Sequence, residues 1–185
     1  MTMTKFLLFS CLLALIYTSP AQAEKADSLQ PLRISAESQN YDGTKKLTTY
    51  IGAVHVTKGT LTINANRVEL TEDAGGHQYA TLYGTPEKLV NYRQKRDGGP
   101  DLWAEGQAER IEYNDNLELV KLYSKAKLTL SEGKRPTHES SGAFISYDSR
   151  ADFISVTNTV GGSSTPGGGN TNAVIYPKLE SKHDQ

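Results

Sequence analysis

Residues 120–130 carry the pattern that most limits what this chain can fold into. Apolar or small side chains occupy every second position, and lysines occupy most of the positions between them. A period of two is typical of a β-strand that buries one face and exposes the other. A helix would instead align Val120 with Ser124 and Lys127, which leaves no apolar stripe to bury. The segment is therefore predicted to be a strand.

Related two-strand units recur along the chain. Residues 108–113 match residues 65–70 position by position, and each stretch is followed by a second strand with a Leu-Tyr pair, at Leu82 and at Leu122. Weaker copies begin near residues 36 and 142. The spacing of the units is irregular but their content is constant. No segment shows helical amphipathicity with caps, so the chain is predicted to be all-β, with many strands joined by short turns.

The expected strands cover residues 32–36, 45–58, 60–71, 78–96, 101–114, 120–130, 139–147 and 151–159. Pro86 interrupts one of these runs and places it at an edge or a bend, because proline cannot donate to a sheet ladder. The apolar side chains also change from odd-numbered to even-numbered positions near Ala65. This shift predicts a bulge or corner at which the strand crosses between two sheets.

Residues 1–23 have the three parts of a secretory signal peptide. Lys5 ends a short amino-terminal region, residues 6–16 are apolar, and residues 21–23 form a small-residue cleavage site. A lipoprotein anchor at Cys11 is the alternative, although the apolar run continues past that cysteine. Cleavage after residue 23 is predicted, and it would remove the chain's single cysteine. A secreted domain without disulfides must be held by its own core or sheet ladders.

The segment after the signal peptide divides into a domain and a tail. Residues 24–159 are expected to form one domain. Residues 160–185 are expected to be a flexible tail, because residues 161–169 are rich in glycine. Residues 173–176 are apolar and β-prone, and such a short strand on a tether is suited to adding itself to a sheet edge, its own or a neighbour's. A frayed end is the alternative.

The sequence offers little chemistry. The four histidines are scattered, and phosphate-cradling and nucleophile-elbow motifs are absent, so we expect no metal, no cofactor and no catalytic site. The 20 basic and 21 acidic side chains argue against a nucleic-acid partner. Residues 93–96, with Lys88, form the only basic cluster. This cluster could meet an anionic headgroup, and a solvated hairpin tip is the alternative.

Three stretches carry a resemblance to a known family. They are residues 30–34, residues 82–86 and the run G-x-V-x-V-x-x-G-x-x-x-I-x-A-x-x-V, which begins at Gly52 and ends at Val68. Together they resemble the OstA-like family of periplasmic lipopolysaccharide-transport proteins. The resemblance covers about residues 30–159, and the glycine-rich insert at residues 161–169 departs from it.

The resemblance implies an antiparallel β-jellyroll, open along one side, whose apolar interior holds the lipid A acyl chains of lipopolysaccharide. It also implies a periplasmic bridge between inner-membrane and outer-membrane components of a transport system, with head-to-tail self-association of the jellyrolls. The inward positions of the repeats are the expected lipid-binding residues, and for each of them a place in a closed core is the alternative. They are Leu32, Ile34, Val54, Val56, Ile63, Leu82, Leu89, Ile111, Tyr113, Leu122 and Leu128.

Two other functions remain open from the sequence. One is a secreted β-sandwich interaction module that polymerises by edge-strand pairing. The other is a β-solenoid enzyme acting on polysaccharide, which would need stacked carboxylates that the irregular repeat does not supply. An open groove predicts that aspartate at Ile111 or Leu122 weakens lipid binding while the fold survives, whereas a closed core predicts unfolding.

Overall fold

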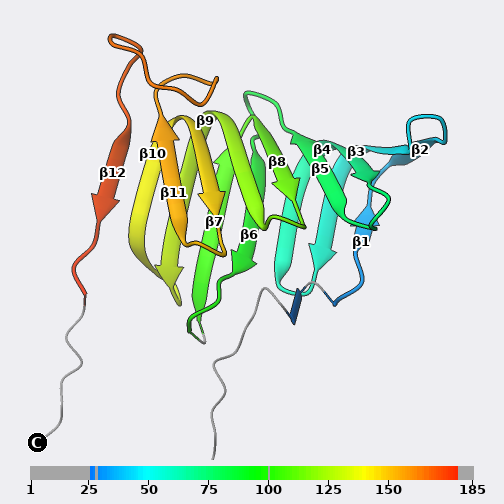
Figure 1. Ribbon diagram of the computed structural model, residues 1–185, viewed down its shortest axis with the longest axis horizontal. Coiled ribbons are helices and arrows are strands. Elements are labelled where there is room, and N and C mark those ends of the chain that lie inside the picture. The colour runs from blue at the N-terminus through cyan, green and yellow to red at the C-terminus, as the bar shows by residue number, and fades with distance from the viewer. Residues whose placement is uncertain (1–25, 28, 100, 179–185) are drawn as a thin grey trace, which may run out of the picture.

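The computed structural model describes residues 26–27, 29–99 and 101–178, so the predicted signal peptide lies outside the described residues (Figure 1). In this part of the chain no helix is long and apolar enough to cross a membrane. The strands are β1 (Arg33–Ser35), β2 (Ser38–Asp42), β3 (Leu47–Lys58), β4 (Leu61–Glu72), β5 (Gln78–Tyr83), β6 (Val90–Lys95), β7 (Leu102–Ala108), β8 (Arg110–Asn114), β9 (Leu119–Glu132), β10 (Arg135–Asp148), β11 (Phe153–Thr157) and β12 (Asn172–Ile175).

Most of the predicted strands are confirmed, with two differences. The run at residues 78–96 is broken around Pro86 into β5 and β6, as expected, whereas the run at residues 101–114 also breaks, at Glu109. Strand β2 has no counterpart among the expected strands. Its sequence is polar and four of its five side chains are exposed, so it carries no alternation to recognise.

All strand pairs are antiparallel, and four long strands each take part in two half-sheets. Half-sheet A runs in the order β2, β3, β4, β5, β8, β9, β10, β11. Half-sheet B runs in the order β1, β3, β4, β6, β7, β9, β10, β12. The shared strands β3, β4, β9 and β10 each give one half to A and the other half to B. The fold is therefore an antiparallel β-jellyroll, as expected, and β1 and β2 lie at the opposite end of its long axis from β12 (Figure 1).

The shared strands bend along one line. In β3 the pairing with β4 skips between Ile51 and Val54, where Gly52 and Ala53 have positive φ angles of 82° and 42°. In β9 Ser124 and Lys125 have positive φ, next to a register shift against β10. Such bulges bend a strand and increase its twist. Strand β4 changes partner from β6 to β5 just after Ala65, which confirms the corner predicted there.

The hydrophobic core lies between the two half-sheets. The alternating side chains of β9 that predicted its strand character, Val120, Leu122, Ala126, Leu128 and Leu130, are all buried in it. Their partners come from both half-sheets, since the bend turns the two apolar faces toward each other. Each fully buried leucine, isoleucine or valine contributes about 1.5–3 kcal/mol relative to an exposed one.

The sequence repeat encodes a brace on the outer face of half-sheet A. Its members are Arg67, Glu69 and Tyr83 in one unit and Arg110, Glu112 and Tyr123 in the other. In each unit the guanidinium lies over the tyrosine ring, at 5.0 Å and 3.9 Å from the centroid. The hydroxyl donates to the glutamate, at 3.0 Å and 2.8 Å. Burial, together with the hydrogen bond to Glu112, raises the pKa of Tyr123 to about 12.

The tethered strand adds to its own sheet. Strand β12 pairs with β10, with Ile175 opposite His138, and the hydroxyl of Tyr176 donates to Glu139 at 2.8 Å. Hydrogen bonds from Lys127 and Tyr176 lower the pKa of that glutamate. All four side chains of β12 are exposed, so backbone pairing and these few side-chain contacts hold the strand.

A glycine in the β5–β6 connection gives a test of how tightly the chain is packed where it passes from one half-sheet to the other. A Cβ on Gly84 would lie 2.6 Å from the carbonyl oxygen of Lys88 and 2.7 Å from the backbone nitrogen of Val90. Gly84→Ala should therefore lower the free energy of unfolding by about 1–3 kcal/mol, because rigid backbone must shift. In the control Gly161→Ala, the nearest atom to the new Cβ is the Thr159 hydroxyl at 3.9 Å. Equal urea midpoints for the two variants would contradict a tightly packed bend.

Candidate functional site

A narrow apolar cavity of about 30 Å³ lies between the half-sheets near β1. The predicted lipid-binding residues that line it are Leu32, Ile34, Val56, Ile63, Leu82 and Tyr113. It is also lined by four apolar residues that the sequence analysis did not select, Leu61, Val68, Leu70 and Ala80. Val68 and Leu70 were passed over because they lie beyond the corner at Ala65, where the inward parity of β4 changes.

The other predicted lining residues lie elsewhere. Val54, Ile111, Leu122 and Leu128 are in the packed core, each no more than 1% exposed. Leu89 differs from the expectation, since it lies in the partly exposed β5–β6 connection and outside the core cluster. The next residue, Val90, takes the inward position instead, because it is the first residue of β6 and is buried.

The interior is filled in this structure. A volume of about 30 Å³ accommodates about one water molecule, far less than an acyl chain. An acyl chain can enter only if the two half-sheets move apart.

The half-sheets meet along a mouth on the side away from the bend, where the strands end in loops. We call the loops of half-sheet A at residues 114–119 and 148–153 rim A, and those of half-sheet B at residues 58–61, 95–99 and 101–102 rim B. Two ion pairs cross the mouth. The Lys58 ammonium lies 3.0 Å from the Asp115 carboxylate, and the Arg96 guanidinium lies 2.5 Å from that of Asp152. In both pairs the cation belongs to rim B.

These bridges are partly shielded from water. The side chains of Lys58 and Arg96 are 10% and 13% exposed, while Asp115 and Asp152 are more open. Burial lowers the pKa of Arg96, but Tyr147 and Asp152 outweigh this effect and the net shift is upward, so the guanidinium stays charged. Breaking a buried ion pair on one side costs about 3–5 kcal/mol, and less where one partner reaches solvent.

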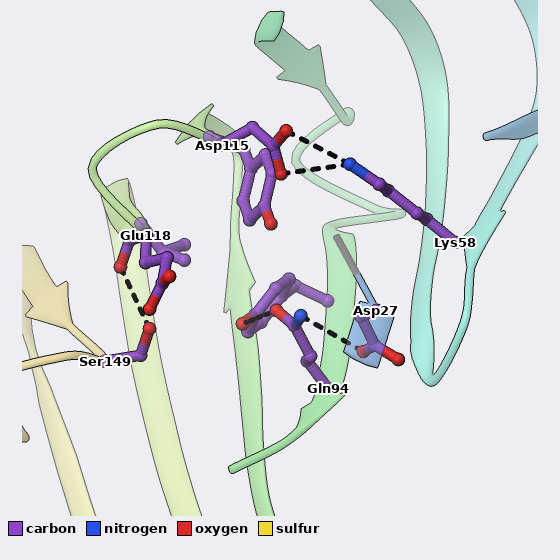
Figure 2. Close-up of a pocket in the computed structure, with 9 residues that line it drawn as sticks. Asp27, Lys58, Gln94, Asp115, Glu118 and Ser149 are labelled. Atoms are coloured by element: carbon purple, nitrogen blue, oxygen red, sulfur yellow. Dashed lines mark hydrogen bonds and ion pairs between the residues drawn. The ribbon is translucent and has the colours of Figure 1, made fainter. Parts of the chain in front are cut away.

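A polar pocket of about 20 Å³ adjoins the apolar cavity, and Lys58, Tyr113 and Asp115 line both (Figure 2). Its other side is formed by Asp27, in the segment that precedes β1, and by Gln94 of β6. Figure 2 shows Gln94 and Asp27 joined by a hydrogen bond, next to the pair formed by Lys58 and Asp115. Among the described residues, no group of three or more His, Cys, Asp or Glu side chains could hold a metal ion.

The basic cluster seen in the sequence is divided between two environments. Arg93 and Lys95 point outward over the ring of Trp103, at 3.9 Å and 5.3 Å from its centroid. Gln94 and Arg96 face the mouth. The alternation of the strand and its loop separates neighbouring residues in this way, which the cluster's composition alone could not predict.

Residues 33–153 match the family described as LptA/(LptD N-terminal domain) LPS transport protein. This match spans the chain from the start of β1 to the start of β11, and so includes both rims and all the residues that line the apolar cavity except Leu32. The chain belongs to this family.

Three relatives of the LptA family illustrate the similarity. The lipopolysaccharide export system protein LptA of Haemophilus influenzae is 31% identical over 134 residues, 71% of this chain and 72% of that protein. LptA of Escherichia coli is 34% identical over 111 residues, 59% of this chain and 57% of that protein. LptH of Pseudomonas aeruginosa is 29% identical over 172 residues, 92% of this chain and 93% of that protein.

The fold agrees with a solved member of the LptA family. The crystal structure of Pseudomonas aeruginosa LptH, described as the LptA-homologous periplasmic component of the lipopolysaccharide transport device, superposes with a TM-score of 0.69. The identity is 26%, and the match covers 82% of this chain and 99% of that one. The relatives are named as export proteins and none as an enzyme, in agreement with the non-enzymatic role expected from the sequence.

The burial of each lining residue predicts how much stability an aspartate at that position would cost. Leu122 is fully buried, so Leu122→Asp should remove about 4 kcal/mol or more of stability and unfold the protein, contrary to the tolerance that a wide-open groove would predict. Leu32 is half-buried at the cavity edge, so Leu32→Asp should cost only about 1–2 kcal/mol. Circular dichroism melting compares them. A folded Leu122→Asp variant would show that the interior is looser than its packing indicates.

Proposed function

We propose that this protein carries lipopolysaccharide by shielding its lipid A acyl chains between the two half-sheets. The observation that supports this function is an apolar interior whose open side, in the part of the chain that the structure describes, is closed by side-chain contacts such as Lys58 to Asp115, in a member of a family described as LPS transport proteins. The proposed lining comprises the cavity residues and, once the half-sheets part, the core residues beside them. No bond is made or broken in the cargo.

The energetics fit a carrier. Burying a methylene contributes about 0.8 kcal/mol, so one acyl chain of a dozen carbons gains roughly 10 kcal/mol relative to water. When the acyl chain moves from one apolar groove to another, the change in this free energy is close to zero. Transfer between like grooves therefore needs no chemistry in this protein, only a source of free energy upstream.

Co-purified lipid tests the proposed cargo. The protein made in a lipopolysaccharide-producing bacterium should show lipopolysaccharide adducts in native mass spectra. Leu32→Asp should reduce the adducts about tenfold or more, because it places a charge where acyl methylenes would lie. Leu29→Asp is the matched control, since Leu29 is 87% exposed. Lipid-free protein in all three samples would favour the β-sandwich interaction module instead.

We further propose that the protein acts in the periplasm after cleavage at residue 23, as one segment of a bridge between inner-membrane and outer-membrane components. The two ends of the long axis support end-to-end assembly. Within the described chain, β1 and β2 end the half-sheets at one end, and β11 and β12 end them at the other. Strands at sheet ends present unpaired backbone groups to a neighbouring chain. Pairing of two different ends does not close, and so gives linear oligomers.

Truncation after Val160 tests the assembly. It removes β12 and uncovers the edge of β10 that β12 occupies, so light scattering should show larger oligomers at each concentration than the full mature chain gives. A truncated protein that stays monomeric while the full chain assembles would show that β12 itself supplies the joining strand. Unchanged assembly would exclude both roles and leave β11 as the edge used at this end.

A further inference from the structure

Rim B holds a buried carboxylate in a set of converging donors. Asp27 is 4% exposed, and it accepts hydrogen bonds from the backbone nitrogen of Thr60 at 2.8 Å and from the Thr60 hydroxyl at 2.5 Å. The side-chain amide of Gln94 donates to the same carboxylate at 3.3 Å. These three donors form an anion-binding site, and the protein's own amino-terminal segment occupies it.

The donors are fixed in their orientation by rim B and β6. The hydroxyl of Tyr92 donates to the Gln94 side-chain oxygen at 2.8 Å, which turns the amide nitrogen toward the carboxylate. The backbone nitrogen of Lys95 donates to the Thr60 hydroxyl oxygen at 3.1 Å, so the hydroxyl proton is free to bind Asp27. Gly59 has a φ of 58°, and a Cβ there would lie 2.0 Å from the Asp27 carboxylate oxygen. The turn is thus shaped for close approach of an anion to the backbone.

A cation and an apolar cavity adjoin this site. Lys58 precedes the same turn, lines the polar pocket with Asp27, and also lines the apolar cavity. Its ammonium is held by Asp115 across the mouth, so parting the half-sheets would remove the anion that now pairs with it. A ligand that brings an anion between the rims would replace this lost partner of Lys58.

We propose that the Lys58-Gly59-Thr60 turn, with Gln94, binds a phosphate monoester of the cargo's headgroup, and that the Asp27 carboxylate holds this place until the lipid enters. The inference rests on the proposed function, because the acyl chain in the cavity is what brings the headgroup to the mouth. A tetrahedral phosphate accepts several donors at once and carries more charge than a carboxylate.

The charges of the two rims orient the headgroup. Rim A carries four carboxylates and one cation, Arg150, so it repels phosphate, whereas rim B carries three cations, among them Lys58 and Arg96, and two carboxylates, Asp97 and Asp101. The lipid is therefore held with its phosphate against rim B. A neutral lipid would leave Lys58 unpaired in the open groove, so the site selects phosphorylated amphiphiles.

Paired lipids test the site in the full mature chain. The affinities for lipid A and for enzymatically dephosphorylated lipid A are measured by displacement of a fluorescent fatty acid. The wild-type protein should bind lipid A at least about tenfold more tightly. Lys58→Gln and Thr60→Val should each reduce this preference, and Asp27→Asn should increase the affinity for lipid A while leaving that for the dephosphorylated lipid unchanged. Inorganic phosphate at millimolar concentration should not displace the fatty acid.

Matched controls separate this site from a general electrostatic effect. Arg93→Gln removes an equal charge from the outer face of β6, and Glu87→Gln removes a carboxyl charge from the exposed β5–β6 connection, so neither should change the preference. Variants at Lys58, Thr60 and Asp27 that change both lipid affinities equally would overturn the phosphate site and reduce these residues to a structural latch. A wild-type protein that binds both lipids equally would overturn it while the proposed function stands. Binding of neither lipid would instead overturn the proposed function.

Discussion

The packing of two apolar faces against each other is the interaction on which this structure depends. Each half-sheet buries the inward residues of the other, and a chain with a single cysteine has no internal disulfide to crosslink the two layers. The faces can meet because β3, β4, β9 and β10 bend and continue from one layer into the other. The two layers are therefore one hydrogen-bonded sheet folded on itself, and the core closes without any connection that crosses it.

The alternation of apolar side chains was enough to predict the strands, the fold class and most of the interior. Leu122, Leu128 and Ile111 are buried because their parity is uninterrupted within their strands. The prediction of which residues face the interior failed where the alternation of apolar and polar side chains changes phase. Leu89 precedes the start of β6, so its neighbour points inward, and Val68 follows the corner in β4. The local pattern marked the corner at Ala65 but not the residue at which β6 begins, because the start of a strand depends on pairing with residues far away in the sequence.

The mouth was less predictable than the core. Lys58 and Asp115 are 57 residues apart, and Asp27 meets Gln94 across 67 residues, so no spacing rule relates these groups. In the sequence Lys58 and Gly59 stand only at the junction of two expected strands, and Asp27 lies before the first expected strand. The fold gives them chemistry by placing buried donors beside an apolar cavity. The repeated Arg, Glu and Tyr residues show the reverse case, since their repetition was visible in the sequence and only the structure explains it as a brace.

The line of positive-φ residues at Gly52, Ala53, Ser124 and Lys125 has a mechanical consequence. It joins the half-sheets through continuous backbone, whereas the opposite side is joined through side chains such as Lys58 and Asp115. The two sides of the interior therefore differ in stiffness: the bend is a continuous backbone hinge, and the rims opposite it are held together by side chains. Rotation about such a hinge would keep the ladder hydrogen bonds within each half-sheet, so opening would be a hinge movement, of the kind that takes microseconds to milliseconds, and not a partial unfolding. For the carrier function proposed above, such a hinge would allow repeated loading and unloading without exposing the strand edges to aggregation.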